Sequence, residues 1–188
     1  MKLTLKDITT IQTGIFAKTV ADGEIIYLQA RHFEEDGQLR HTLQPDLKPE
    51  FISNKHLLKD GDILFAAKGI KNFAALYKNE NGAAVASTSF FVIRLQKEFQ
   101  NKMLTEFLAW LINHPQSQKY LKNKAIGTSM VSISKSVLEE LEVFIPTVKT
   151  QMTILQINDL RNKEKKLHLQ IAMLREQLVQ QQIINSIK

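Results

Sequence analysis

The chain has 188 residues, of which 44% are hydrophobic and 23% are charged, a composition typical of a globular domain with its own core. The formal net charge of +6 favours a polyanionic partner, and the absence of cysteine excludes disulfides, thiolate metal sites and cysteine nucleophiles. No signal-peptide core and no apolar run of roughly 18–20 residues is present, so we expect a cytoplasmic protein without membrane association.

The chain falls into two regions of different texture. Residues 1–147 carry 18 Lys and Arg against 16 Asp and Glu, whereas residues 148–188 carry seven against three. The first region mixes short apolar runs with Gly and Pro, and the second contains neither. This contrast predicts a globular domain over 1–147 followed by one long helix over 148–188.

Short strands are predicted in the first half of the globular region. A strand or turn ends at Gly14, a β-rich strand covers 24–33, and a turn at 60–61 leads into a buried strand over 63–67. Two more strands are expected to be joined through a turn at 79–82, and their apolar run over 90–93 is typical of a strand buried on both faces.

Helices are predicted in the second half of this region. Apolar residues at i, i+3 and i+4 indicate an amphipathic helix from about Met103, which Pro115 breaks or restarts. A Gly/Ser/Thr loop then leads to a short helix over 135–140 that Ser134 can cap, and to a last strand over 142–145. The predicted class is α+β, with a bent, mostly antiparallel sheet and helices.

The C-terminal helix has the pattern of a coiled coil. At about 1.5 Å per residue it would reach roughly 60 Å. A heptad seam has eight positions, of which Glu164 and Gln181 are polar and can fix register or orientation. The six apolar positions, which we expect at a dimer interface, are Ile157, Leu160, Leu167, Ile171, Leu174 and Leu178. The alternative is a helix folded back on its own domain.

Sequence motifs of catalysis are absent. There is no phosphate loop, no dinucleotide fingerprint, no serine nucleophile elbow and no Pro-Pro that an adenine-methyltransferase motif would need. The five histidines lack the spacing of a metal site. Asp62 with Lys68 is one alternative, a nuclease site, but Asp62 falls in a predicted turn. We therefore expect no catalytic site, no metal and no cofactor.

Four segments together resemble one half of the specificity (S) subunit of type I restriction-modification enzymes. They are KLTLKDITTIQTGIFAK, KDGDILFAAKG, the segment IGTSMVSISKSVLEELEVFIPTVKTQ and the long helix. The third is the most specific, because the family has a Gly- or Ser-rich loop, an Ile-Ser start, a Leu rung, an Ile-Pro end and a Gln that opens the helix. The matching residues here are Gly127–Ser129, Ile133–Ser134, Leu138, Leu141, Ile145–Pro146 and Gln151.

The resemblance implies recognition of double-stranded DNA by a non-catalytic subunit. Methylation would come from a type I methyltransferase (modification) subunit, and cleavage from a restriction subunit that joins through it. The usual S subunit has two target-recognition domains and two helices, and this chain has one of each. It is therefore either a fragment or a short half-subunit that forms a homodimer. An antiparallel helix pair would then read a bipartite, palindromic target.

Loops beside the predicted strands carry the side chains that we expect to contact DNA. Asn72 has the geometry to pair with adenine and Arg31 with guanine. The alternative for each candidate is a solvated surface residue, or a core residue in the case of Phe73. The candidates are Lys18, Thr19, Arg31, His32, Lys68, Lys71, Asn72, Phe73, Lys122, Lys124, Thr128 and Ser129.

Two other classes of protein remain open from sequence. One is a coiled-coil scaffold whose globular head binds protein and has no DNA specificity. The other is a catalytic subunit such as a nuclease, which the missing metal-ligand spacing disfavours.

Overall fold

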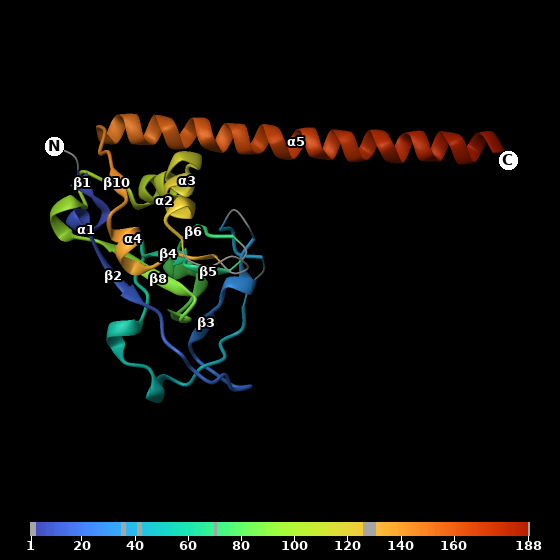
Figure 1. The fold of residues 1–188 in the computed structure, drawn as a ribbon. Coiled ribbons are helices and arrows are strands. Elements are labelled where there is room, and N and C mark those ends of the chain that lie inside the picture. Colours follow the sequence, from blue (N-terminus) through green and yellow to red (C-terminus); the bar gives the residue numbers. More distant parts are fainter. Residues whose placement is uncertain (1–2, 35–36, 41–42, 70, 126–130, 188) are drawn as a thin grey trace. The chain divides into compact units, whose positions relative to one another are not determined.

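The structure is a computed structural model that describes residues 3–34, 37–40, 43–69, 71–125 and 131–187. The chain divides into two compact units, Met1–Val148 and Lys149–Lys188. The first unit combines helices with a largely antiparallel sheet, and the second belongs to the single helix α5 (Val148–Ile187) (Figure 1). The predicted α+β class, with mostly antiparallel strands and a long C-terminal helix, is confirmed.

The main sheet of the first unit has four strands in the order β2 (Thr9–Thr13), β8 (Phe90–Leu95), β4 (Ile63–Ala66) and β6 (Ala74–Leu76). All three neighbouring pairs are antiparallel. In the central strand β8, Phe90, Val92 and Ile93 are all at most 2% exposed. Phe91 of the same run is half-buried. Because alternate side chains of a strand point to opposite faces, both faces of β8 are thus largely covered, as predicted, though not completely at Phe91.

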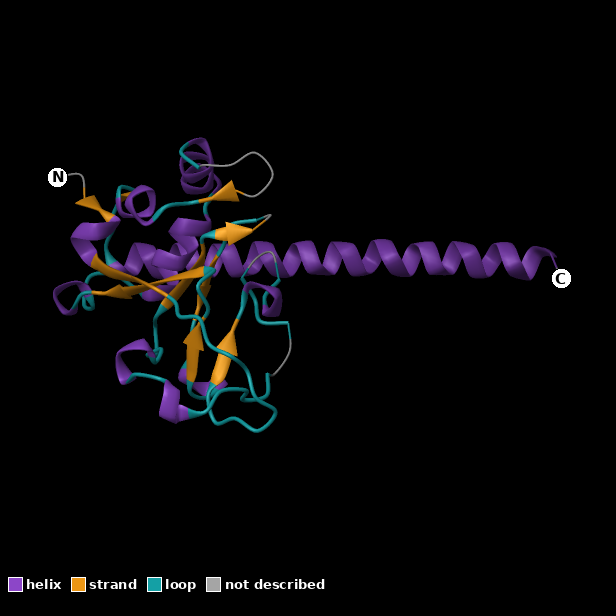
Figure 2. Ribbon diagram, turned by 60° about the horizontal axis from the view of Figure 1, so that its bottom comes forward, coloured by secondary structure: helices purple, strands orange, loops and turns teal. Residues whose placement is uncertain are grey.

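A separate pair of strands runs parallel, as Figure 2 shows: β3 (Ile26–Leu28) and β7 (Ala84–Ala86). The strand predicted over 24–33 is therefore too long, because the chain enters a 3-10 turn at Ala30–His32. The two strands flanking the turn at 79–82 do not form a hairpin. β6 pairs with β4, while β7 lies between β3 and an isolated bridge from Leu57.

Part of the core of this unit lies on its helices, with fully buried side chains such as Leu108 and Leu121. Another cluster of the core joins residues of the four-stranded sheet with residues of the β3–β7 pair. Leu64 of β4 and Val92 of β8 are buried in it together with an aromatic group. That group consists of Phe33, Phe73 and Phe90, whose ring centroids lie 5.6–6.2 Å apart. Tilted and edge-to-face rings at this spacing are favourable beyond their burial alone.

Helix α2 (Thr105–Asn113) packs against the edge strand β6, and α3 (Pro115–Asn123) packs against α2. Pro115 stands at the first position of α3, so it restarts the helix as the sequence predicted. The side chain of Asn113 both accepts from the Ala74 N–H and donates to the Ala74 carbonyl, each at 2.7 Å. This amide occupies backbone groups of β6 that an unprotected sheet edge would leave open.

The two ends of the first unit are joined by short elements. Strand β1 (Leu3–Thr4) pairs antiparallel with β10 (Glu142–Val143). Helix α1 (Leu5–Ile8) directly follows β1, and helix α4 (Lys135–Glu139) directly precedes β10. The hydroxyl of Ser134 accepts from the Val137 N–H at 3.3 Å, which is the predicted cap of α4.

Helix α5 is a continuous helix of 40 residues, as expected from a segment without Gly or Pro. All six apolar seam residues named from the sequence are exposed, with fractions between 45% for Ile171 and 64% for Leu160. In the part of the chain that the structure describes, no helix has both the length and the hydropathy that crossing a bilayer requires.

Candidate nucleic-acid interface

The first group of predicted contact residues surrounds the short strand β5 (Lys68–Gly69). Lys68 on this strand and Lys71 in the loop after it are both exposed. β5 pairs antiparallel with β9 (Val131–Ser132), with Lys68 opposite Ser132. Two lysines therefore project beside the chain segment that leads toward the exit of the domain. Thr128 and Ser129, which were predicted for the exit loop, lie outside the described residues.

Asn72 and Phe73 are buried, which differs from the contact role predicted for Asn72 and agrees with the core alternative for Phe73. Asn72 is 7% exposed, and its amide nitrogen donates to the carbonyl of Ala66 at 2.8 Å, so this donor is already used inside the domain. Phe73 is 6% exposed and packs against Phe33 and Phe90. Both residues anchor the lysine-bearing loop from below, and neither presents its side chain to a nucleic acid in this conformation.

Arg31 and His32 lie in the 3-10 turn after β3, and not at the end of a strand as expected. Arg31 is exposed and His32 is half-buried. The Gln29 N–H lies 3.3 Å from Nδ1 of His32, which orients the ring. The next residue, Phe33, contacts Phe73 at 5.7 Å between ring centroids. This contact brings the arginine-bearing turn and the lysine-bearing loop of β5 together over one aromatic cluster.

Lys18 and Thr19 are exposed in the loop between β2 and β3. This loop lies toward the end of the domain away from α3 (Figure 1). Gly14 begins it where the chain passes so close to β7 that an added Cβ would lie 2.1 Å from the Ser87 carbonyl oxygen. The loop is then held by the buried Tyr27, whose hydroxyl donates to the Ile15 carbonyl at 2.9 Å and accepts from the Ala17 N–H at 3.3 Å.

Between those two anchored residues, Phe16 projects outward and is 85% exposed. Ile15 and Ala17 pack against the small cluster around Tyr27, so the side chain between them points away from the domain. Phe16 was not among the surface residues predicted from the sequence. The apolar run Ile15–Phe16–Ala17 carries no sign of which member faces solvent, and only the pairing of its neighbours with Tyr27 decides this.

Lys122 and Lys124 are exposed at the end of α3, but Lys124 is already engaged. Its Nζ lies 3.1 Å from the Glu140 carboxylate and 5.1 Å from the centre of the Tyr120 ring. The hydrogen bond to Glu140 raises the pKa of Lys124 above its ordinary value. Glu140 thus offsets part of the charge that this lysine would offer to a phosphate, and Lys122 is the stronger candidate of the two.

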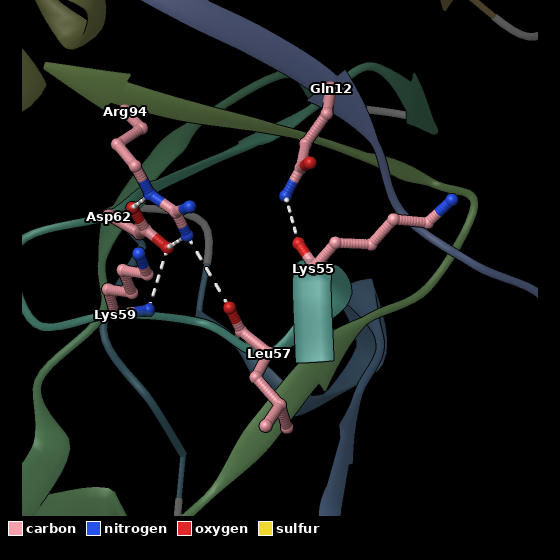
Figure 3. Close-up of polar contacts among 6 residues, drawn as sticks. All are labelled: Gln12, Lys55, Leu57, Lys59, Asp62 and Arg94. Carbon is pink, nitrogen blue, oxygen red and sulfur yellow. Dashed lines mark hydrogen bonds and ion pairs between the residues drawn. The ribbon is translucent and has the colours of Figure 1, made fainter. Parts of the chain in front are cut away.

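A partly buried ion pair, drawn in Figure 3, lies at the start of β4, the strand that precedes Lys68. Asp62 is 1% exposed, and both its oxygens accept from Arg94 of β8, at 2.7 Å from Nε and 2.6 Å from Nη2. The Lys59 N–H also donates to this carboxylate at 2.7 Å, in a turn where Gly61 takes φ +82°. The hydrogen bonds that Arg94 donates to Asp62 raise the pKa of Arg94 above its ordinary value. Asp62 is therefore a structural residue, and its pairing removes it as a partner of Lys68 in a nuclease site.

The first unit also holds a cavity of about 450 Å³. It is lined by apolar side chains such as Leu28, Phe33 and Leu64, with Glu80 as its charged lining residue. No three His, Asp or Glu side chains in the described ranges lie close enough to hold a metal ion. The interface candidates are accordingly the exposed basic loops.

The comparison with protein families defines the class. The family model of the type I restriction modification DNA specificity domain matches residues 2–171, and the chain belongs to this family. The resemblance stated from the sequence is thus confirmed. Comparison with curated proteins gave no match.

Solved structures with similar folds come from the same type of system. The chain is similar to the type I restriction-modification S subunit from M. genitalium, with 16% identity, a TM-score of 0.59, and coverage of 87% of this chain and 39% of that one. The HsdS subunit from Thermoanaerobacter tengcongensis is 11% identical, with a TM-score of 0.56, and the match covers 87% of this chain and 37% of that one. A third structure comes from work on complex assembly and conformational transition of the type I R-M system. It is 12% identical, with a TM-score of 0.63, and the match covers 87% of this chain and 38% of that one. The chain therefore spans less than two fifths of each of these proteins.

Proposed function

We propose that this chain is a DNA sequence-specificity component of a type I restriction-modification enzyme and reads one half-site of a bipartite target. The observation that carries this proposal is the family match over residues 2–171. Exposed basic residues on loops support it, since Lys18, Arg31 and Lys68 can hold phosphates or base edges. The same role implies double-stranded DNA as the ligand and a cytoplasmic location.

In this proposal the chain itself is not catalytic. A type I methyltransferase subunit supplies methylation, and a restriction subunit joins through it. The pairing of Asp62 with Arg94 favours this reading over a nuclease, because that carboxylate is fully occupied within the fold. The chain is expected to need no cofactor of its own.

The partner for the apolar seam of α5 is, we infer, a second copy of the chain. All six apolar seam residues remain at least 45% exposed in the single chain. Leaving this many large apolar side chains in water is unfavourable, at about 25 cal/mol per Å² of apolar surface. A two-fold pair of helices buries the same seam from both copies and carries two recognition domains, so it would read a palindromic target.

A second apolar stripe on α5 supports the docking of the methyltransferase. Leu169, Met173, Ile183 and Ile187 recur in outer heptad positions, roughly opposite the seam, and are 49–80% exposed. A helix pair that buries the seam leaves this stripe uncovered. An apolar helix surface on another subunit is the occupant that we propose for it.

The experiment is to express the chain with a type I methyltransferase subunit in cells and to map the methylated bases of the genome by sequencing. We expect two inverted half-sites with an unread spacer. Cells with the methyltransferase subunit alone are the control. A single contiguous target would overturn the bipartite model, and a chain that binds a protein partner but no DNA would favour the scaffold alternative.

A further inference from the structure

Two polar residues interrupt the apolar seam of α5. Glu164 takes an a position of the heptad and Gln181 a d position. The side-chain pairs found along this helix, Lys163 with Asp159 at 2.7 Å and Gln180 with Glu176 at 2.8 Å, both lie outside the seam. Glu164 and Gln181 would therefore both enter the interface when two copies meet, and each would then need a hydrogen-bond partner.

The orientation of the two helices decides which residues meet. In a parallel, in-register pair each seam residue faces itself, so Glu164 would face a second carboxylate in a largely dry layer. In an antiparallel pair each a position faces a d position of the partner. Glu164 can then face the partner's Gln181, whose amide N–H donates to the carboxylate.

We propose that this Glu–Gln layer sets the register of an antiparallel homodimer. The two-fold axis lies between Ala172 and Met173. Leu167 then packs against the partner's Leu178, and Ile171 against the partner's Leu174. These contacts form a continuous apolar centre of four layers, with one Glu164–Gln181 layer at each end. The inference rests on the antiparallel homodimer already expected for this chain and adds its register and the polar layer that sets it.

Neighbouring registers leave the polar residues unpaired. A shift of one heptad in one direction places Glu164 against the partner's Leu174, and a shift in the other places Gln181 against the partner's Ile171. In either case a polar group is buried against a leucine or isoleucine without a hydrogen bond, which is unfavourable. The chosen register also sets His168 beside the partner's Arg175, on an exposed edge where solvent screening keeps the repulsion small.

Disulfide trapping tests the register directly, because the chain has no cysteine of its own. Two single-cysteine variants, carrying tags of different size, are mixed and oxidised under mild conditions. We expect Leu167→Cys to cross-link to Leu178→Cys, and Ile171→Cys to Leu174→Cys, since a disulfide needs Cα atoms within about 7 Å. Leu167→Cys mixed with Leu174→Cys is the mismatched control and should give no product.

Each other result overturns a defined part of the inference. Self-cross-linking of Leu167→Cys would indicate parallel helices. Cross-linking of Leu160→Cys to Leu178→Cys would indicate the register shifted by one heptad. A monomer by sedimentation, with no product from any pair, would overturn the homodimer itself and not merely its register. A shifted register alone would leave recognition of a single half-site unchanged.

A charge exchange tests the polar layer without cysteines. Gln181→Glu places two carboxylates in each end layer and should weaken dimerisation by about tenfold or more, because both cannot remain ionised at low cost. The double variant Glu164→Gln with Gln181→Glu restores one Glu and one Gln per layer and should recover the original dissociation constant. An equal loss in the double variant would show that these residues do not face each other.

Discussion

At the scale of single residues, the same side chain has opposite roles in two places. Phe16 is 85% exposed on an anchored loop, whereas Phe73 is 6% exposed within an aromatic cluster. Each phenylalanine lies in a short segment between predicted strands, so the local sequence does not indicate which ring is buried and which is exposed. The contrast comes from what surrounds each ring, which makes the two residues a matched pair.

Truncation of the two rings should have different consequences for stability. Phe73→Ala removes a buried ring and should lower the free energy of unfolding by about 3–5 kcal/mol. Phe16→Ala removes an exposed one and should change it by less than about 0.5 kcal/mol. Urea denaturation followed by circular dichroism measures both. A similar loss in the two variants would contradict the burial described for Phe73.

Asp62 is the second residue whose role depends on its surroundings. Its carboxylate accepts two hydrogen bonds from Arg94 and one from the Lys59 N–H, whereas Asp60 in the same turn is exposed. Asp62→Asn turns an amide N–H toward the Arg94 donors and should cost about 2–4 kcal/mol; the lower part of this range applies because Arg94 is 29% exposed.

Asp60→Asn is the control for this substitution. Its exposed side chain can still accept from the Asn79 N–H through the amide oxygen, so the free energy of unfolding should change by less than about 0.5 kcal/mol. Thermal or urea unfolding of both variants measures the two changes in the free energy of unfolding. Equal stabilities of the two variants would mean that the pair with Arg94 contributes little.

At the scale of elements, β5 and its loop are the part of the first unit that we propose to contact DNA. Lys68 and Lys71 are exposed, and the residues beneath them, Asn72 and Phe73, are buried. A loop anchored in this way presents its charges without a large loss of conformational entropy on binding. Its role as a phosphate-binding element is a prediction that the salt dependence of binding can test.

Lys68→Ala and Lys71→Ala should each weaken DNA binding by the assembled complex at low salt. The slope of the logarithm of the binding constant against that of the salt concentration should become shallower by about 0.9 for each phosphate that is no longer neutralised. Lys78→Ala is the control, because this exposed lysine lies outside the β5 loop. Fluorescence anisotropy at several salt concentrations gives the slopes, and unchanged slopes would remove the β5 loop from the interface.

At the scale of the whole molecule, the proposed function depends on having two recognition units in one assembly. Linking two binding modules makes the second binding event intramolecular, which raises overall affinity by about 100-fold or more. The exposed seam of α5 is the feature that would provide this linkage. Affinity for a complete target should therefore depend on residues that contact no DNA.

Leu174→Asp places a charge in the centre of the seam and should give a monomer. Its affinity for DNA with two half-sites should fall by about 100-fold, while its affinity for one half-site should not change. Asn162→Asp, an exposed outer position of the same helix, is the control. Sedimentation gives the oligomeric state and fluorescence anisotropy gives the affinity. A monomeric variant that kept full affinity for the complete target would contradict the homodimer proposal.

The local features of this protein could be predicted from short segments of its amino-acid sequence. The absence of Gly and Pro over 148–187 fixed α5 as one helix, the apolar run over 90–93 indicated a strand covered on both faces, and Ser134 and Pro115 marked helix starts. These predictions succeeded because each depends on the periodicity or backbone chemistry of a short segment. The family resemblance was also readable, since several short motifs occur in a fixed order.

The pairing of distant segments and the exposure of side chains depended instead on long-range contacts in the folded domain. The strands β6 and β7 flank one turn, yet they pair with β4 and β3 because strand partners are chosen by long-range backbone pairing and core packing. Likewise Asn72 and Phe73 turned inward, while Phe16 turned outward because Tyr27 holds its two neighbours. The exposure of a side chain depends on the whole fold. For this reason the interface predicted from sequence included Asn72 and Phe73, which the structure places in the core.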